Sequence, residues 1–477
     1  MWLWHLRDNI VPALIQQAKA QGECAHGNFR PYNLNQPVLF PAAMRDCLEE
    51  DHLVFFVLDA VSKLDLSAIY AVYAERKGGQ PPYDPSMMVA LLLYGYCTGI
   101  RSSRRLEIAT WEQIPFRVLT ADQHPDHDTI AVFRTTHFAA LGGHFSQVLR
   151  LATETGLVRF GHVALDGSKM KANAAKHKSR THAEIEKESE ARRAEMEELL
   201  RQAECVDAEE DVQYGKGVRG DRLPKDLVRR KDRLEKLEAA KQRIEARSAA
   251  RVEETPRAKA AAKPKAMAKA QCNLTDMDSR VMPDGSTGEF YSGYNAQAVV
   301  DSDKQVIVAV GLTQSANDFE QAIPMMLATR ANIGANAMKG MKVSMDAGYR
   351  SLINIDAIEG KDVDLHVSLC GSRSGTANAE EGNLPNTIQS QEGPCERMQR
   401  KMNSEEGQSL YRKRKAIVEP VFGHIKSILG FRQFSCRGYS KASHEWSLVC
   451  TVHNLLKLFR YGGWQDDNSS PPPPAFA

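Results

Sequence analysis

The sequence lacks the features of a secreted, membrane-spanning or thiolate-metal protein. Its nine cysteines include no Cys-x2-Cys pair, and an odd, scattered set is typical of reduced thiols rather than of a disulfide framework. The longest apolar run, Met87 to Ile100, is too short to cross a bilayer. Arg7 and Asp8 interrupt the apolar N-terminus, which therefore does not resemble a signal peptide. These absences predict a soluble, cytoplasmic protein.

The chain also lacks a strong net charge. The 62 basic and 60 acidic residues leave a formal charge of only +2, so the overall balance gives no indication of a nucleic-acid partner. The hydrophobic share of 42% is ordinary for a globular protein. A length of 477 residues allows two or three domains, each with its own core. The positions of the charges are therefore more informative than their sum.

Residues 31–157 are predicted to form a helical domain, preceded by an extension over 1–30. Apolar residues recur at helical spacing over 53–61 and again over 86–97, where Asp84-Pro85 supplies an N-cap and a first-turn proline. A break at Thr98-Gly99 precedes a second helix over 102–111, and we expect Asp128 to cap a third over 129–141.

Two helices joined by a glycine-containing turn are compatible with a helix-turn-helix that binds DNA. Most short helix pairs, however, only pack a core, so this signal is weak by itself. If the region binds DNA, the expected phosphate contacts are four arginines, namely Arg101, Arg104, Arg105 and Arg134.

Residues 171–270 form a charged segment in which 46 of 100 residues are ionic. Apolar residues recur at helical spacing over 196–206 and at heptad spacing from Leu227 to Ile244, and a glycine-rich breaker lies between them. This pattern predicts an antiparallel helical hairpin with a thin apolar seam, followed by a basic Ala/Lys tract over 256–270. The plainer interpretation is a solvated coiled coil without chemistry of its own.

The remainder, 158–465, has an α/β pattern. Predicted strands cover 160–166, 294–300, 305–312, 341–345 and 365–369, a helix covers 319–333, and further helices follow. Residues 371–408 are rich in Gly, Ser, Asn, Gln and Glu and are predicted to form a long loop. The proline-rich tail over 466–477 is predicted to be disordered or extended.

Two aspartates follow apolar runs in equivalent ways. Asp166 ends Val-Ala-Leu at 163–165, and Asp346 ends Val-Ser-Met at 343–345. A carboxylate at the end of a buried strand costs several kcal/mol unless it is paired or binds a metal. Either aspartate alone is readily explained as a turn or cap residue. Two on separate strands of one predicted sheet indicate a shared site.

A third carboxylate, Glu419, lies in the segment YRKRKAIVEPVFGHIK over 411–426. Lys426 follows two helical turns later on nearly the same face. The plain alternative is a capped helix with an exposed Glu419 and with Pro420 in its first turn. Two divalent cations bridged by carboxylates would serve phosphoryl transfer, and all-oxygen ligands favour Mg²⁺ or Mn²⁺. The adjacent basic residues would meet substrate phosphates; they are Arg412, Lys413, Arg414 and Lys415.

Several motifs together resemble bacterial insertion-sequence transposases of the DDE class. They are VALDGSK around Asp166, NLTDMDSR at 273–280, GYNAQAVVD at 293–301, DAGYRS at 346–351 and YRKRKAIVEPVFGHIKSILGFRQFSCRG at 411–438. The branch is the one with a Tyr-Arg-Glu-Lys signature, and residues 30–140 resemble its InsH-type N-terminal helical domain. The motifs occur in the expected order, which is far more specific than any one of them.

The resemblance implies an RNase H-like catalytic fold, an α/β sheet with flanking helices, with the charged segment inserted between its first and second strands. It implies Asp166, Asp346 and Glu419 as ligands of two Mg²⁺ or Mn²⁺ ions, and Lys426 as a contact to the cleaved DNA end. The implied partners are the DNA of the element's terminal inverted repeats and target DNA. On that DNA the chain would assemble as a homo-oligomer.

One spacing departs from the family signature, which is Tyr-x2-Arg-x3-Glu-x6-Lys. Four residues, not three, separate Arg414 from Glu419. Either Lys415 takes the basic position or the register differs by one residue. The resulting hypothesis is metal-dependent cleavage at element ends followed by strand transfer into target DNA. The alternatives are an RNase H-like nuclease that only hydrolyses, a decayed transposase that only binds DNA, and a structural coiled-coil protein.

Overall fold

The computed structural model describes residues 43–74, 81–214, 225–254, 269–284, 288–359, 362–368 and 393–462. The side chains of 203–214, 225–228 and 250–254 are not described. The chain divides into two units, Met1–Cys47 and Leu48–Ala477. In the first, only the short helix η1 (Met44–Cys47) is described, so the following account concerns the second unit. The predicted extension over 1–30 and the tail over 466–477 lie outside the described residues.

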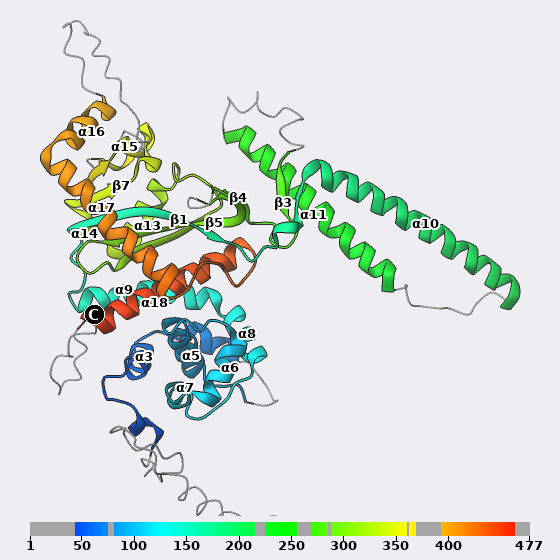
Figure 1. Cartoon of the computed structure of the whole chain (residues 1–477), viewed down its shortest axis with the longest axis horizontal. Coiled ribbons are helices and arrows are strands. Elements are labelled where there is room, and N and C mark those ends of the chain that lie inside the picture. Colours follow the sequence, from blue (N-terminus) through cyan, green and yellow to red (C-terminus); the bar gives the residue numbers. More distant parts are fainter. Residues whose placement is uncertain are drawn as a thin grey trace, which may run out of the picture. The chain divides into compact units, whose positions relative to one another are not determined.

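A mixed sheet forms the centre of the second unit (Figure 1). Strand β1 (His162–Lys171) pairs antiparallel with β5 (Phe290–Asp301), which pairs antiparallel with β6 (Ile307–Thr313) and with β4 (Arg280–Pro283). On the other side of β1 lie β7 (Met341–Met345) and β8 (Val363–Val367), both parallel to it. The apolar runs of these strands are buried, as expected for a sheet covered by helices on both faces.

Helices fill the region before the sheet, as the sequence predicts. They are α3 (Leu53–Ser62), α4 (Ser67–Ala74), α5 (Pro85–Cys97), α6 (Ser103–Glu112), α7 (Ile114–Leu119), α8 (His127–Thr136) and α9 (Phe138–Glu154). Asp84 caps α5 as predicted, because its carboxylate accepts from Ser86 N at 2.7 Å. The predicted cap at Asp128 is wrong: Asp126 accepts from Thr129 N, and a break at His137 separates α8 from α9.

The helical region and the sheet share one hydrophobic core that extends from Val54 to Leu458. Helix α9 packs along α18 (Tyr439–Tyr461), and the two lie side by side in Figure 1. The Tyr96 hydroxyl donates to Glu445 at 3.4 Å, and Glu445 is fully buried. A fragment ending near residue 157 would therefore expose the face of α9 that α18 covers.

The helices that follow β6 cover the sheet and complete its edge. They are α13 (Ala322–Ile333), α14 (Ala335–Met338), α15 (Leu352–Ile358), α16 (Pro394–Asn403) and α17 (Glu405–Gly423). The predicted helix start at 319 is three residues early. The predicted loop over 371–408 is wrong from Pro394 onward, where α16 and the first turn of α17 are helical. Its residues 371–392 lie outside the described part of the chain.

The charged segment is an antiparallel helical hairpin, as predicted (Figure 1). The hairpin consists of helices α10 (His182–Tyr214) and α11 (Lys225–Glu254). At its base, β2 (Ser179–Thr181) precedes α10 and pairs with β3 (Gln271–Asn273), which follows α11. Near this root a small core is buried, formed by Ile185, Leu237, Ala240, Ile244 and Cys272. Farther out the seam is thin, and Leu200 is 45% exposed.

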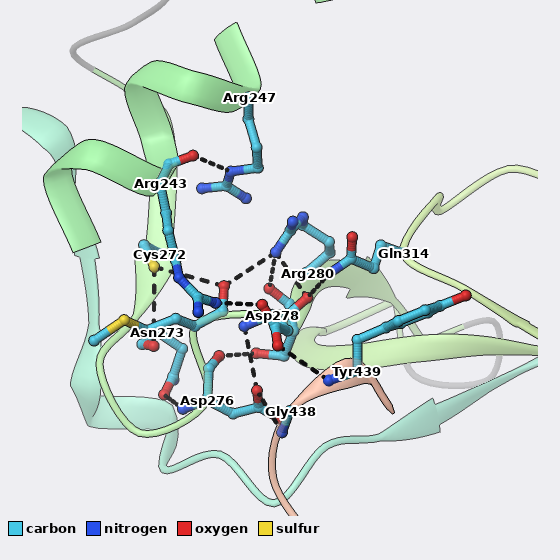
Figure 2. A network of polar contacts seen from close by, with 12 residues as sticks. Arg243, Arg247, Cys272, Asn273, Asp276, Asp278, Arg280, Gln314, Gly438 and Tyr439 are labelled. Carbon is cyan, nitrogen blue, oxygen red and sulfur yellow. Dashed lines mark hydrogen bonds and ion pairs between the residues drawn. The ribbon is translucent and has the colours of Figure 1, made fainter. Parts of the chain in front are cut away.

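Polar contacts fix the root of the hairpin to the rest of the unit (Figure 2). Arg243 of α11 forms an ion pair with Asp278, whose other oxygen accepts from Tyr439 N at 3.1 Å. Asp276 accepts from Gly438 N and from the buried Tyr294 hydroxyl. These bonds tie the hairpin to the first turn of α18, so its base is held on two sides.

Candidate active site

Asp166 and Asp346 lie next to each other in the register of two parallel strands. The pairing of β1 with β7 runs from His162–Lys342 to Leu165–Met345, and the two aspartates are the next residues on each strand. One part of the expectation is wrong: Asp166 does not end its strand, because β1 continues to Lys171 against β5. Asp166 therefore projects from the middle of β1, at the level where the neighbouring β7 stops.

The Asp166 carboxylate is largely buried and paired with a buried cation. Arg414 of α17 donates from Nη1 to Oδ2 at 3.0 Å, and the backbone N–H of Gly167 donates to Oδ1 at 2.8 Å. Arg414 is only 6% exposed, and its Nε has no partner among the described residues. Burial raises the pKa of Asp166 to about 6 although Arg414 opposes this shift, and nearby Asp346 and Asp318 add to it.

Asp346 starts the short turn that follows β7. It is the N-cap of η4 (Ala347–Tyr349), and its Oδ1 accepts from the backbone N–H of Gly348. An ionised oxygen in this position satisfies a free N–H of the turn. The carboxylate is half-buried, which leaves it able to bind a further ligand.

Helix α17 passes beside both aspartates. It packs on β1 and β7, with Ile417, Val418 and Val421 buried. The alternative with Pro420 in the first turn is wrong, because Pro420 lies inside α17. Proline has no N–H for the carbonyl of Ala416, and Gln305 Nε2 donates to that carbonyl instead, at 3.0 Å.

Glu419 lies on α17 between the buried Val418 and the exposed Pro420, and its side chain is exposed. Within the described residues, no group of three or more His, Cys, Asp or Glu side chains is close enough to hold a metal ion. The structure thus brings Asp166 and Asp346 into adjacent register but does not bring Glu419 into one cluster with them. The three-carboxylate metal site stays a prediction.

Lys426 contacts the same strand as Arg414. Its Nζ donates to Ser168 Oγ at 2.6 Å, and Ser168 is on the same face of β1 as Asp166 because the side chains of a strand alternate. Lys426 lies in a π-helical turn, η5 (His424–Ile428), rather than in the regular helix that the spacing predicts. Burial lowers the pKa of Lys426.

Some of the other predicted basic residues are exposed, and others donate hydrogen bonds within the protein. Arg412, Lys413 and Lys415 are exposed, unlike Arg414 beside them, and Arg104 and Arg105 on α6 are also exposed. In contrast, Arg101 Nη2 donates to the carbonyl of Gly430 at 2.7 Å, and Arg134 Nη1 donates to the carbonyl of Arg101 at 2.7 Å. Phosphate contacts by any of these residues stay predictions.

A polar cluster on the opposite face of β1 was not predicted. Asn295 and Gln297 of β5 both donate to Asp318, and the buried Tyr349 hydroxyl donates to Gln297. A signal was present in GYNAQAVVD, where two amides alternate with apolar residues along a buried strand. Buried amides require partners, but the sequence alone does not indicate which residues supply them.

Two family models match the chain. The model described as "Transposase domain (DUF772)" matches residues 43–136, and the model described as "Transposase DDE domain" matches residues 271–455. The chain belongs to the DDE transposases. No curated protein and no solved structure is similar enough to match it.

The two matches fit the architecture of this transposase. The first covers the helical region from η1 to α8, and the second begins at β3, after the hairpin, and includes Asp346 and Glu419. Asp166 lies before the second match, so its place in the site rests on the register of β1 with β7. No helix in the described ranges is long and apolar enough to span a membrane.

Proposed function

We propose that this transposase cleaves DNA at the ends of its element and joins the freed 3′-hydroxyls to target DNA, with two Mg²⁺ or Mn²⁺ ions bound by Asp166, Asp346 and Glu419. The fold we propose is RNase H-like. The strand order supports it: three antiparallel strands, β6, β5 and β1, continue into the parallel strands β7 and β8. The hairpin is inserted between β1 and β5, as the resemblance implies.

The observation that carries the proposal is the adjacency of Asp166 and Asp346. Their strands are parallel and in register up to the preceding residues, and neighbouring strands lie about 4.8 Å apart. Two carboxylates at that spacing repel each other unless a cation lies between them or beside them. In this structure Arg414 supplies a positive charge to one of them.

The donor set fits a hard divalent cation. The groups at Asp166 and Asp346 are carboxylates, and no cysteine or histidine of the described ranges is among their hydrogen-bond partners. Oxygen ligands of this kind select Mg²⁺ or Mn²⁺ over softer ions. When bound, such ions activate the attacking oxygen and stabilise the leaving oxygen of the phosphodiester.

The residues of the chain would divide the remaining work. Asp166 in the middle of β1 and Asp346 at the end of β7 hold fixed negative charge side by side. Arg414, rather than the exposed Lys415, takes the basic position of the signature because it meets Asp166. Glu419 follows Arg414 by five residues, about 1.4 turns, on a helix that packs against β1 and β7. Lys426, at Ser168, would bind a phosphate of the cleaved end.

DNA would approach from the side where the exposed cations lie. Arg412, Lys413 and Lys415 on α17 and Arg104 and Arg105 on α6 are available for phosphates, and neutralising phosphates dominates DNA affinity. Assembly as a homo-oligomer on the terminal inverted repeats is part of the same proposal. Arg101 and Arg134 would act only indirectly, by holding their loops.

The test uses the full-length chain and DNA that carries one element end. Asp166→Asn, Asp346→Asn and Glu419→Gln keep side-chain size and remove charge, so each should lower Mg²⁺-dependent cleavage by several orders of magnitude while DNA binding persists. Glu405→Gln, at the exposed start of α17, is the matched control and should cleave normally.

The products separate the alternatives. Joined products with target DNA support strand transfer, whereas nicked DNA alone favours a nuclease that only hydrolyses. DNA binding without any cleavage by the wild-type chain favours a decayed transposase. Cleavage by Glu419→Gln at the wild-type rate would remove Glu419 from the site.

A further inference from the structure

A fourth carboxylate, Asp318, lies beside Gly167 and Gly348, which follow the two proposed metal ligands by one and two residues. It is in the connection between β6 and α13 and is half-buried. Two amides of β5 hold it: Asn295 Nδ2 and Gln297 Nε2 each donate to Asp318 Oδ1 at 2.7 Å. Both amide residues are almost completely buried, so this oxygen is fixed by donors that cannot turn to solvent.

The backbone after Asp166 is shaped around Asp318. A Cβ on Gly167 would lie 2.6 Å from Asp318 Oδ1 and 2.2 Å from Gln297 Nε2. A side chain at this position would therefore require Asp318 or Gln297 to move away.

The second oxygen of Asp318 faces the turn that carries Asp346. A Cβ built on Gly348 would lie 3.6 Å from Asp318 Oδ2 and 2.9 Å from Asp346 Oδ1, so both carboxylates flank this one glycine. Among the described residues, no cation forms an ion pair with Asp318, whereas Asp166 has Arg414. The negative charge of Asp318 is therefore not neutralised within the described part of the chain.

Further bonds lock the loop of Asp318 to the loop of Asp346. Asn354 Nδ2 donates to the carbonyls of Phe319 and Tyr349, both at 2.7 Å. The buried Tyr349 hydroxyl donates to Gln297 Oε1, which closes the connection from the turn after Asp346 back to β5. Burial raises the pKa of Tyr349, and the negative charges of Asp318, Asp166 and Asp346 add to the shift.

We propose that Asp318 is a positioning residue of the metal site: its fixed charge increases the affinity of Asp166 and Asp346 for divalent cations without binding the metal directly. This inference rests on the proposed function. A purely structural role is the competing explanation, in which Asp318 serves only as an acceptor for two buried amides. The two roles differ in one property, since the first needs the charge and the second needs only one oxygen.

Asp318→Asn separates these roles, because the amide oxygen of asparagine can still accept from Asn295 and Gln297 while the charge is lost. Mn²⁺ binding to the full-length chain is measured by calorimetry without DNA. We expect Asp318→Asn to weaken Mn²⁺ binding about tenfold, the lower end of the effect that residues just outside the metal's own ligands typically have on affinity. Asp318→Glu, which restores the charge, should recover part of the affinity. Glu320→Gln, an exposed acid two residues away, is the control and should bind as wild type.

Wild-type Mn²⁺ affinity in a folded Asp318→Asn chain would overturn the inference and leave a structural acceptor. If Asp318→Asn does not melt cooperatively, Asn295→Ala is measured instead, because it removes one donor to Asp318 and keeps the charge. Asn295→Ala should weaken Mn²⁺ binding by a smaller factor, and unchanged affinity would again overturn the inference. Asp166→Asn separates a failure of this inference from a failure of the proposed function. If it binds Mn²⁺ like the wild type, or if the wild type binds none, the proposed function fails and this inference fails with it.

Discussion

The helical hairpin and the centre of the sheet at Asp166 both carry charge, but the charges are in different environments. Along α10 and α11, ion pairs such as Arg193–Glu238 have side chains that are 57% and 39% exposed. In the middle of the sheet, the side chains of Arg414 and Asp166 are 7% and 23% exposed. Solvent screens the first pair, whereas burial makes the second expensive to break. A high density of charged residues in the sequence therefore does not indicate a functional site, whereas a buried charged side chain in the structure does.

The largest contrast should come from removing one partner of each pair. Arg414→Met leaves the Asp166 carboxylate buried without its counterion, which typically costs about 3–5 kcal/mol. Arg193→Met in the hairpin should leave the midpoint of urea unfolding almost unchanged. Urea titrations followed by circular dichroism measure both. The double variant Arg414→Met with Asp166→Asn should regain much of the loss, and equal effects of the two single variants would contradict the comparison.

A second contrast concerns pH, at a buried carboxylate away from the metal site. Burial raises the pKa of Asp301 to about 6, so the folded chain binds this proton more tightly than the unfolded chain. The resulting stabilisation is complete below the unfolded pKa near 3.8 and is lost as pH rises through 6, by up to about 3 kcal/mol.

Asp301→Asn should therefore flatten the change of unfolding free energy between pH 4 and 6, measured by urea titration at several pH values. An exposed hairpin acid supplies the control, and Glu238→Gln should leave the slope as in the wild type. An unchanged slope in Asp301→Asn would show that other groups cause the dependence.

The hairpin itself should show a contrast between its root and its outer part. Removing 191–232 and joining the ends with a short Gly/Ser linker keeps Ile244 and Arg243, so we expect a cooperative melt within a few degrees of the wild type. Removing all of 181–255 deletes Arg243 and uncovers Cys272, and should lower the melting temperature more. Differential scanning calorimetry measures both. If the shorter deletion is already molten, the outer hairpin packs on the core.

The smallest expected effects are those of single arginine substitutions, and they should differ between exposed arginines and those that donate hydrogen bonds within the protein. Arg104→Ala and Arg105→Ala should each reduce the slope of log K against log salt by about 0.9 if each contacts one phosphate, without changing thermal stability. Arg101→Ala should instead lower stability, because its guanidinium holds Gly430 and lies 5.0 Å from the centre of the Phe431 ring. Fluorescence anisotropy with labelled DNA, at several salt concentrations, measures the slopes. Unchanged slopes for both α6 variants would place DNA binding elsewhere.

Local signals in the sequence determined much of the fold. The strand β7 begins and ends where its apolar run does, and α5 starts at its Asp84-Pro85 cap. The order of strands, insert and helices also follows from periodicity, because the repeat of apolar residues that marks a helix or strand depends only on residues close by in the sequence. Asp166 and Asp346 were recognisable as candidates for the same reason, since each directly follows a short apolar run.

Only the tertiary structure decided which polar groups meet. Arg414 and Asp166 are 248 residues apart, and nothing local distinguishes Arg414 from the exposed Lys415. The same holds for Asp318, whose partners Asn295 and Gln297 come from another strand. The local sequence pattern determines where a helix or strand forms and which of its faces is buried. The partner of a buried charge, however, comes from whichever helix or strand packs over it. That choice depends on the packing of the whole unit and therefore cannot be derived from spacing along the chain.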